Sequence, residues 1–198
     1  MVNGVLFDIG GVLVALDGAP RLAQLMGVEL DRDRLHALWT QAPSVVAHET
    51  GRMSASEFAE RAVFELGLSI GPDAFLREFQ AWPVALQPGA LELLDELPAT
   101  LRKAALSNSC ELHWRRVQTW GLRERFEHVY LSHEIGHLKP QPQAYLVALG
   151  GMNLAAEEVL FLDDSRANVQ AARDLGLRAE VATDPMHARQ VLHDYGLL

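Results

Sequence analysis

The feature of this 198-residue chain that most restricts its fold is the alternation of short apolar stretches with stretches of helical periodicity. Apolar runs of about four to eight residues are typical of buried strands, and longer amphipathic runs are typical of helices. Because strands that alternate with helices are joined by crossover connections, the pattern predicts a parallel sheet with helices on its faces. The predicted strands are residues 2–7, 101–107, 127–131, 158–162 and 178–182, and the predicted helices are 89–97, 110–120, 142–149, 166–175 and 185–194.

One section breaks this alternation. From about residue 19 to residue 83, one helical pattern follows another. Within it, Ser54 and Glu57 have the spacing of a capping box at the start of a helix. We therefore expect a doubly wound, Rossmann-like α/β domain with an all-helical insert after its first strand. The predicted boundaries are residues 1–15 and 85–198 for the α/β domain and 16–84 for the insert.

The charge of the chain disfavours two classes of partner. Its 17 Lys and Arg residues stand against 26 Asp and Glu residues, which gives a net charge of −9. This balance disfavours binding to nucleic acid or to an anionic membrane surface. The sequence carries neither a signal-peptide pattern nor an apolar run long enough to span a bilayer, and its single cysteine, Cys110, forms no intrachain disulfide. We expect a cytoplasmic monomer or homodimer that binds a small anionic metabolite.

Polar residues directly follow four of the predicted strands. In an open parallel sheet the carboxyl ends of the strands share one edge, and ligands bind in the crevice at that edge. Side chains that are far apart in the sequence are therefore expected to converge there. In chain order they are Asp8, Ser107 with Asn108, Lys139 in the turn HLKPQP, and Asp163 with Asp164.

This set of residue types indicates metal-assisted chemistry on a phosphate. Three carboxylates at one edge repel one another unless a cation or protons compensate, and Lys139 supplies only one positive charge. A hard divalent cation such as Mg²⁺ binds through one or two carboxylates plus water, and it commonly works with a phosphate. Ser107, Asn108 and Lys139 offer donors that suit phosphoryl oxygens. An aspartate can then attack phosphorus and form an aspartyl phosphate that water hydrolyses.

Four segments of the chain resemble, in order, the four motifs of the haloacid dehalogenase superfamily. They are FDIGGVL, LSNS, LKPQPQAY and FLDDSRANVQAA, and the resemblance spans residues 2–12 and about 85–182. The helical insert stands where that family carries its small helical cap. The branch with Gly at the second position of the first motif, which includes bacterial phosphatases of glucose 1-phosphate and other sugar phosphates, is the most similar. The resemblance implies a Mg²⁺-dependent phosphatase of a small phosphomonoester, most of all a sugar phosphate.

The resemblance also implies a role for each motif residue. Asp8 would be the nucleophile and a metal ligand, and the Gly10 carbonyl would face the metal. Asp164, which stands four residues before Asn168, would be the second metal carboxylate, and Asp163 would act indirectly or through water. The residues expected to hold the phosphoryl group are Ser107, Asn108 and Lys139.

The chain departs from the family pattern at Gly10. Most phosphatases of the superfamily have an aspartate there, which protonates the leaving oxygen and later activates water, and such help is worth about 10²- to 10⁴-fold in rate. Three explanations are open. The substrate has a good leaving group, such as an anomeric sugar phosphate. Another residue replaces the acid, with Asp17, His48 and Glu49 as candidates. Alternatively, turnover is slow and the main role of the protein is to bind or regulate through a phospholigand.

Other activities are consistent with parts of the sequence. A 2-haloacid dehalogenase also starts from an aspartate nucleophile, but it needs no metal, so Asp163 and Asp164 favour the phosphatase. The segment HEIGH, residues 133–137, matches a zinc-protease signature, yet Gly136 and Pro140 leave no room for the sustained helix that this chemistry needs. Cys110, with His113 nearby, is expected to be a buried residue and not a reactive thiol.

Overall fold

The computed structural model describes the backbone of residues 1–198 and the side chains of residues 1–31 and 34–198. Its main sheet has five strands in the order β5-β4-β1-β6-β7, and all neighbouring strands are parallel. The α/β fold predicted from the alternation is therefore confirmed. The strands are β1 (Gly4–Phe7), β4 (Arg102–Ser107), β5 (His128–Leu131), β6 (Val159–Asp163) and β7 (Arg178–Val181).

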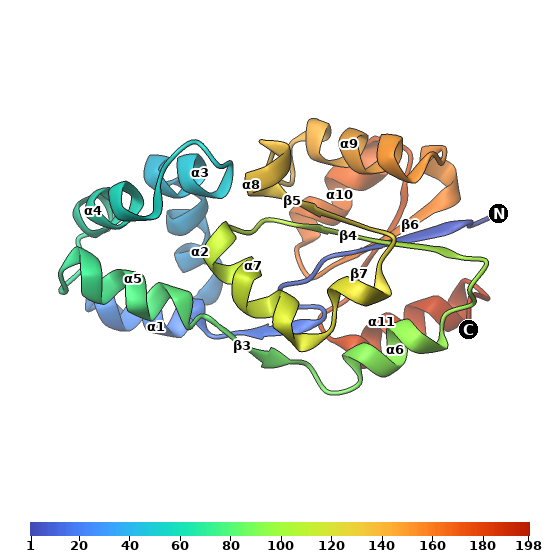
Figure 1. Ribbon diagram of the computed structural model, residues 1–198, viewed down its shortest axis with the longest axis horizontal. Coiled ribbons are helices and arrows are strands. Elements are labelled where there is room, and N and C mark those ends of the chain that lie inside the picture. The colour runs from blue at the N-terminus through green and yellow to red at the C-terminus, as the bar shows by residue number, and fades with distance from the viewer.

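Helices cover both faces of this sheet (Figure 1). Along the central strand β1, Val5 and Phe7 point into one core cluster and Leu6 into the other, as the two-residue period of a strand requires. The first cluster is covered by α6 (Ala90–Glu96), α7 (Glu111–Val117) and α11 (Pro185–Asp194), and the second by α9 (Pro142–Met152) and α10 (Arg166–Asp174). Because both faces are covered, β1 is buried along its whole length.

Five helices form the helical insert and lie at one end of the sheet (Figure 1). They are α1 (Gly18–Met26), α2 (Arg32–Gln41), α3 (Pro43–Glu49), α4 (Ala55–Glu65) and α5 (Pro72–Gln80). They pack around their own cluster of buried side chains, which includes Trp39, Phe58 and Phe79. The Ser54 side chain accepts a hydrogen bond from the Glu57 backbone N–H and caps α4, as the spacing of these two residues predicts.

Two strands that the sequence does not reveal connect the insert to the main sheet. They are β2 (Val14–Leu16) and β3 (Pro83–Leu86), which pair antiparallel with an irregular register near Leu16. With three and four residues, and a proline at the start of β3, neither has a readable two-residue period. These strands lie at the two ends of the helical section expected from about residue 19 to residue 83, and the division of the chain at residues 16–84 stays a prediction.

The remaining elements are short. They are α8 (Ser132–Ile135) and the 3₁₀ turns η1 (Gln118–Trp120), η2 (Arg123–Arg125) and η3 (Ala156–Glu158). Helix α9 extends three residues beyond its predicted end because Gly150 and Gly151 continue it. At Gly151 a Cβ atom would overlap the Tyr130 hydroxyl, so glycine allows α9 to pack on β5. No helix in the described chain is long and apolar enough to cross a membrane.

Candidate active site

The carboxyl edge of the main sheet gathers three carboxylates and one buried lysine. Oxygen atoms of Asp8, Asp163 and Asp164 lie within 4.8 Å of one another. The Lys139 Nζ lies 2.8 Å from Asp8 Oδ1 and 2.7 Å from Asp163 Oδ2. Asp8 directly follows β1, Asp163 ends β6, and Lys139 lies in the turn before α9. The fold therefore assembles at one edge the charged residues that the sequence distributes over the ends of separate elements.

Asp8 is fixed by the backbone around it. Its N–H donates to the Leu162 carbonyl at 2.8 Å, and its Oδ1 accepts from the Ile9 N–H at 2.7 Å. Burial raises the pKa of the Asp8 carboxyl to about 7; the Lys139 charge lowers this pKa, and the charges of Asp163 and Asp164 raise it. A divalent cation beside these carboxylates would favour the ionised form. Asp8 is thus held in one orientation in a site that compensates its charge incompletely.

Lys139 is almost completely buried and is positioned by Asn108. The Asn108 Oδ1 accepts from the Lys139 N–H at 2.8 Å, and the Asn108 Nδ2 donates to the Lys139 carbonyl at 2.9 Å. Burial alone would lower the pKa of the Lys139 ammonium, but the charges of Asp163 and Asp8 raise it above its usual value. Lys139 therefore stays charged. The Asn108 side chain therefore holds the lysine turn through both ends of its amide, and the contact expected between Asn108 and a phosphate stays a prediction.

Asp163 and Asp164 face different surroundings. The Asp163 carboxylate accepts from the Ser165 N–H at 2.8 Å, from Asn168 Nδ2 at 3.0 and 3.1 Å, and from Lys139 Nζ at 2.7 Å. These bonds involve both of its oxygens, and the indirect role expected for Asp163 stays a prediction. Asp164, in contrast, lies beside a cavity between the main sheet and the insert.

Ser107 and two glycines complete the edge. Ser107 ends β4 and is 5% exposed, and its hydroxyl makes no hydrogen bond to the part of the chain that the structure describes. Gly11 has a φ of +82°, and a Cβ there would lie 2.6 Å from the Asp164 carboxyl carbon. At Gly10 a Cβ would lie 2.8 Å from Leu16 Cδ1. The loop after Asp8 thus passes close to both Asp164 and Leu16.

The three residues considered as replacements for the missing acid lie elsewhere. Asp17 Oδ2 accepts from Arg21 Nε at 2.7 Å, His48 Nδ1 donates to the Met53 carbonyl at 3.1 Å, and Glu49 accepts from Trp39 Nε1 at 3.2 Å. None of the three belongs to the group formed by Asp8, Asp163 and Asp164, whose oxygens lie within 4.8 Å of one another. The structure does not bring them to the carboxylate cluster.

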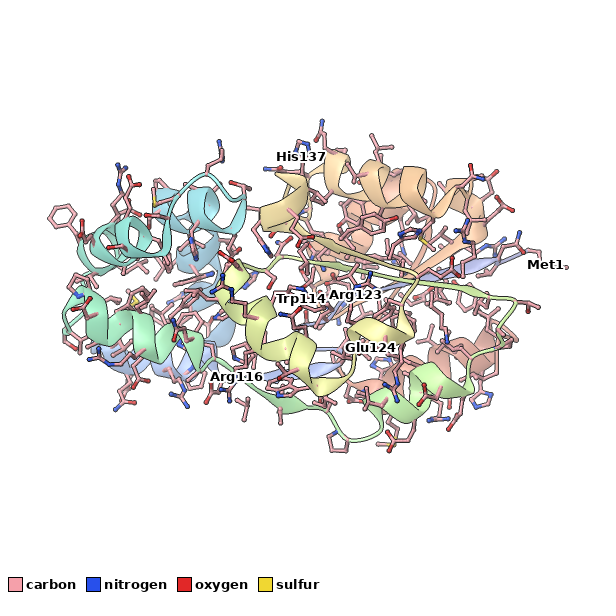
Figure 2. All side chains as sticks on the ribbon, viewed as in Figure 1. Met1, Trp114, Arg116, Arg123, Glu124 and His137 are labelled. Atoms are coloured by element: carbon pink, nitrogen blue, oxygen red, sulfur yellow. The ribbon has the colours of Figure 1, made fainter. Side chains whose placement is uncertain are left out.

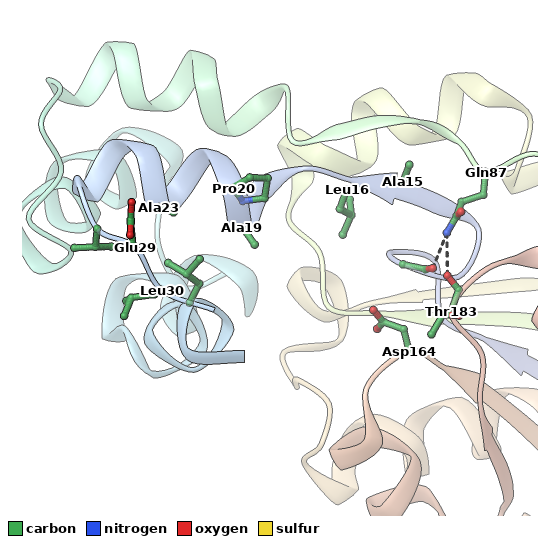
Figure 3. A pocket seen from close by; sticks show the side chains of 13 residues that line it. Ala15, Leu16, Ala19, Pro20, Ala23, Glu29, Leu30, Gln87, Asp164 and Thr183 are labelled. Atoms are coloured by element: carbon green, nitrogen blue, oxygen red, sulfur yellow. Dashed lines mark hydrogen bonds between the residues drawn. The ribbon is translucent and has the colours of Figure 1, made fainter. Parts of the chain in front are cut away.

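The cavity beside Asp164 has a volume of about 960 Å³ (Figure 3). Loops contribute Gly11, Gln87 and Thr183 to its lining, and β2 and the insert contribute mostly apolar residues. The Gln87 amide donates to the Gly11 carbonyl at 2.7 Å and to the Thr183 carbonyl at 3.3 Å, so it fixes the loop that follows Asp8. Sequence reasoning missed Gln87 and Thr183 because neither belongs to a motif and each reaches the site from a separate loop.

Two alternative sites are not formed. Helix α8 is a single turn that ends at Gly136, so His133 and His137 do not share the face of a sustained helix as a zinc protease requires. His133 Nδ1 donates to the Ser109 carbonyl at 3.0 Å, whereas His137 lies at the outer surface next to α9 (Figure 2). Cys110 is 1% exposed, and burial raises the pKa of its thiol to about 12, which disfavours the reactive thiolate.

A parallel sheet with a helical insert and an acidic cluster at its carboxyl edge defines the chain as an open α/β protein, a class whose members commonly bind ligands at that edge. The chain belongs to the haloacid dehalogenase-like hydrolase family, whose profile matches residues 2–176. The family resemblance inferred from the four motifs is therefore confirmed.

Individual relatives extend this assignment. The D-ribitol-5-phosphate phosphatase of Bacteroides thetaiotaomicron is 28% identical over 193 residues, covering 89% of each chain. The structure of a haloacid dehalogenase family enzyme from the same organism, in complex with magnesium and inorganic phosphate, matches with a TM-score of 0.74, 23% identity and coverage of 91% of this chain and 94% of that one. An L-2-haloacid dehalogenase of Xanthobacter autotrophicus matches with a TM-score of 0.64, 25% identity and coverage of 90% and 76%. The prediction of an enzyme of this family, with phosphatases among its relatives, agrees with these matches.

Proposed function

We propose that this protein is a Mg²⁺-dependent phosphatase that hydrolyses a small phosphomonoester through an aspartyl-phosphate intermediate. The observation that carries the proposal is the carboxylate cluster of Asp8, Asp163 and Asp164 with Lys139 beside it. Its donors are all carboxylate oxygens, which suit Mg²⁺ and not a soft metal ion. The residues present thus fit the cation that the family implies.

Each residue has a part in the proposed reaction. Asp8, Asp164 and the Gly10 carbonyl would hold Mg²⁺, which supplies positive charge next to the phosphoryl oxygens. An oxygen of Asp8 attacks phosphorus, the bond from phosphorus to the ester oxygen breaks, and the leaving oxygen takes a proton from water and departs as the alcohol. Water then attacks the same phosphorus, releases inorganic phosphate and regenerates the Asp8 carboxylate.

The other polar residues bind and orient. The Lys139 ammonium and the Ser107 hydroxyl donate to the phosphoryl oxygens, and Asn108 keeps the Lys139 turn in place through its two hydrogen bonds. Asp163 holds the Lys139 ammonium from the other side. Stabilisation of the charge on the transferred group by such preorganised donors is the main source of rate enhancement in phosphoryl transfer.

The name of the ribitol-phosphate relative makes phosphates of sugars and sugar alcohols the first substrates to test. Since Gly10 supplies no acid to the leaving oxygen, a substrate whose alcohol leaves easily, such as an anomeric sugar phosphate, is favoured among them. A cytoplasmic location is consistent with such a metabolite.

Dehalogenation of a 2-haloacid is the less favoured reaction. The fold is shared with a haloacid dehalogenase, but displacement of halide from carbon has no use for three clustered carboxylates. A phospholigand-binding protein without turnover would need the same cluster, so only an assay separates it from the enzyme.

The test is phosphate release from a panel of phosphomonoesters, with Mg²⁺ and with a chelator, on the unaltered protein and on Asp8→Asn. We expect Mg²⁺-dependent release that falls by about three orders of magnitude or more in Asp8→Asn, because the amide is not a nucleophile. The variant nearly preserves the size of the side chain, and circular dichroism checks that it is folded. Release by Asp8→Asn at the rate of the unaltered protein would exclude the covalent mechanism.

A further inference from the structure

The wall of the cavity beside Asp164 differs between its two sides. On the side of the main sheet the lining is polar, with Asp164, Gln87 and Thr183 (Figure 3). On the opposite side, β2, α1 and the start of α2 contribute a run of apolar side chains. They include Leu16, Ala19, Pro20, Ala23, Leu30 and Leu35. Of the side chains that the structure describes, Glu29 is the one polar group that the insert adds to this wall.

Leu16 connects this apolar wall to the candidate active site. It is 52% exposed although it is a large apolar residue, and it lines the cavity at the end of β2. Its Cδ1 is the atom that a Cβ at Gly10 would meet, at 2.8 Å. A leucine therefore lies beside the loop that follows Asp8, on the path from that loop to the insert.

The physical consequence concerns the organic part of the substrate. An apolar group placed against this wall is removed from water and covers exposed apolar surface, which is favourable. A hydroxyl group placed there loses its hydrogen bonds to water and finds no described side-chain partner on the wall except Glu29. The Gln87 Nε2 is not such a partner, because it already donates to the Gly11 and Thr183 carbonyls, and the Gln87 Oε1 belongs to the opposite side of the cavity.

We infer that the organic part of the substrate occupies this cavity and is largely apolar, as in an alkyl or aryl phosphate, in preference to a fully hydroxylated sugar or polyol phosphate of the same size. The inference rests on the proposed phosphatase function, and within it places alkyl and aryl phosphates ahead of the sugar and polyol phosphates that the ribitol-phosphate relative puts first. The preference for apolar over hydroxylated substrates is assigned to Leu16 and to the face of α1 that carries Ala19, Pro20 and Ala23. A hydrophobic wall discriminates against added hydroxyl groups by about 10- to 100-fold, which sets the expected effect.

The experiment compares two esters with the same five-carbon chain, pentyl phosphate and D-ribitol 5-phosphate, on the unaltered protein with Mg²⁺. We expect kcat/KM for pentyl phosphate to be higher by about tenfold or more. Ribitol is the better leaving group, since neighbouring hydroxyls acidify its alcohol, so this preference cannot arise from the chemistry of departure. An equal or higher kcat/KM for ribitol 5-phosphate would overturn the inference and leave the proposed function intact.

Failure of the proposed function gives a different result. If neither ester nor any other phosphomonoester is hydrolysed, the phosphatase proposal falls, and calorimetry with the same two esters then tests the cavity alone. Tighter binding of pentyl phosphate supports an apolar cavity, and equal or weaker binding overturns it.

Paired variants test whether Leu16 carries the selection. Leu16→Asn is expected to lower kcat/KM for pentyl phosphate by about tenfold and to leave the value for ribitol 5-phosphate unchanged or higher. The matched control is Leu38→Asn on α2, because Leu38 is also exposed, at 41%, and does not line the cavity. Equal losses for both esters in Leu16→Asn would show a structural role and contradict the assignment of selectivity to this residue.

Discussion

At the carboxyl edge of the sheet several buried side chains carry charge, whereas the buried cluster inside the helical insert is apolar and contains aromatic rings packed on one another. At the edge, the Lys139 ammonium lies between Asp8 and Asp163 at 2.8 and 2.7 Å. In the insert, the Phe79 ring centre lies 5.0 Å from those of Phe58 and Trp82. A buried charge depends on its partners, since removing one leaves another uncompensated, while an aromatic cluster loses stability with the volume removed.

The two regions therefore have different roles in the protein. The edge fixes the reacting groups through short, directed bonds on the rigid strands β1, β4 and β6, and the insert supplies a surface whose shape depends on packing. We therefore expect changes at the edge to abolish turnover, and changes inside the insert to lower stability while the chemistry of the folded protein is retained.

The largest expected effect is that of Lys139→Met. Without the ammonium, Asp8 and Asp163 are left buried without a cation, which costs about 3 to 5 kcal/mol in the free energy of unfolding. The loss of one preorganised donor also lowers kcat by about 10²- to 10³-fold. Because a bound cation compensates the same carboxylates, we expect Mg²⁺ to restore part of the stability and little of the activity. Urea unfolding and phosphate release, each with and without Mg²⁺, measure the two effects.

The matched control is Lys103→Met, at the other lysine of the chain. Its Nζ donates to the Leu94 carbonyl at 2.9 Å, away from the acidic edge. Loss of this bond costs about 1 kcal/mol and should not change kcat. Unchanged kcat in Lys139→Met would contradict the role of this residue at the reacting group.

The second effect tests the insert. Phe79 is fully buried in the aromatic cluster, so Phe79→Ala should lower the free energy of unfolding by about 3 to 5 kcal/mol. At a temperature where the variant is folded, kcat should stay within a few-fold of that of the unaltered protein. Phe64→Ala is the control, since Phe64 lies on α4 of the same insert and is 88% exposed, and it should change stability by less than about 0.5 kcal/mol. Equal effects of the two substitutions would show that the aromatic cluster does not stabilise the insert.

The same contrast explains what could be predicted from the sequence. The five strands of the main sheet and the helices between them were recognisable because short apolar runs alternate with stretches of helical periodicity, and Asp8, Lys139 and Asp163 were recognisable because each lies in a short motif. The partner of the Asn108 amide could not be predicted, since it depends on how a turn 31 residues later folds back.

The lining of the cavity could not be predicted from the sequence either, because it depends on which loops meet in the fold. Leu16 stands in a three-residue strand without a readable period, and its place beside Gly10 arises only when β2 pairs with β3. Gln87 and Thr183 come from loops 96 positions apart. Sequence periodicity reports which side of an element is buried, and it carries no information on which loops meet.

The smallest effects concern two titratable residues where the insert packs on α7. Burial lowers the pKa of His113 to about 4, and burial raises the pKa of Glu49 to about 7. His113 takes up its proton in the unfolded chain first as the pH falls below about 6.5, so its contribution to stability decreases from there down to about pH 4. Glu49 binds its proton more tightly in the folded chain, so its contribution is present below about pH 4.5 and is lost as the pH rises to about 7.

Between pH 4.5 and 6.5 the contributions of His113 and Glu49 to the free energy of unfolding therefore change with pH in opposite directions. Each changes by at most about 1.4 kcal/mol per pH unit, so they largely cancel in the unaltered protein. A substitution that removes one of these titrating groups makes the pH dependence due to the other measurable. Relative to the unaltered protein, the free energy of unfolding should rise with pH in Glu49→Gln, which retains an acceptor for Trp39 Nε1, and fall with pH in His113→Gln. Urea unfolding at a series of pH values measures these differences, and changes at other titrating groups are common to all three proteins. Parallel pH profiles for the two variants would mean that the contact between the insert and α7 does not hold Glu49 and His113 in their neutral forms. The distinction between a charged edge and an uncharged insert would then fall.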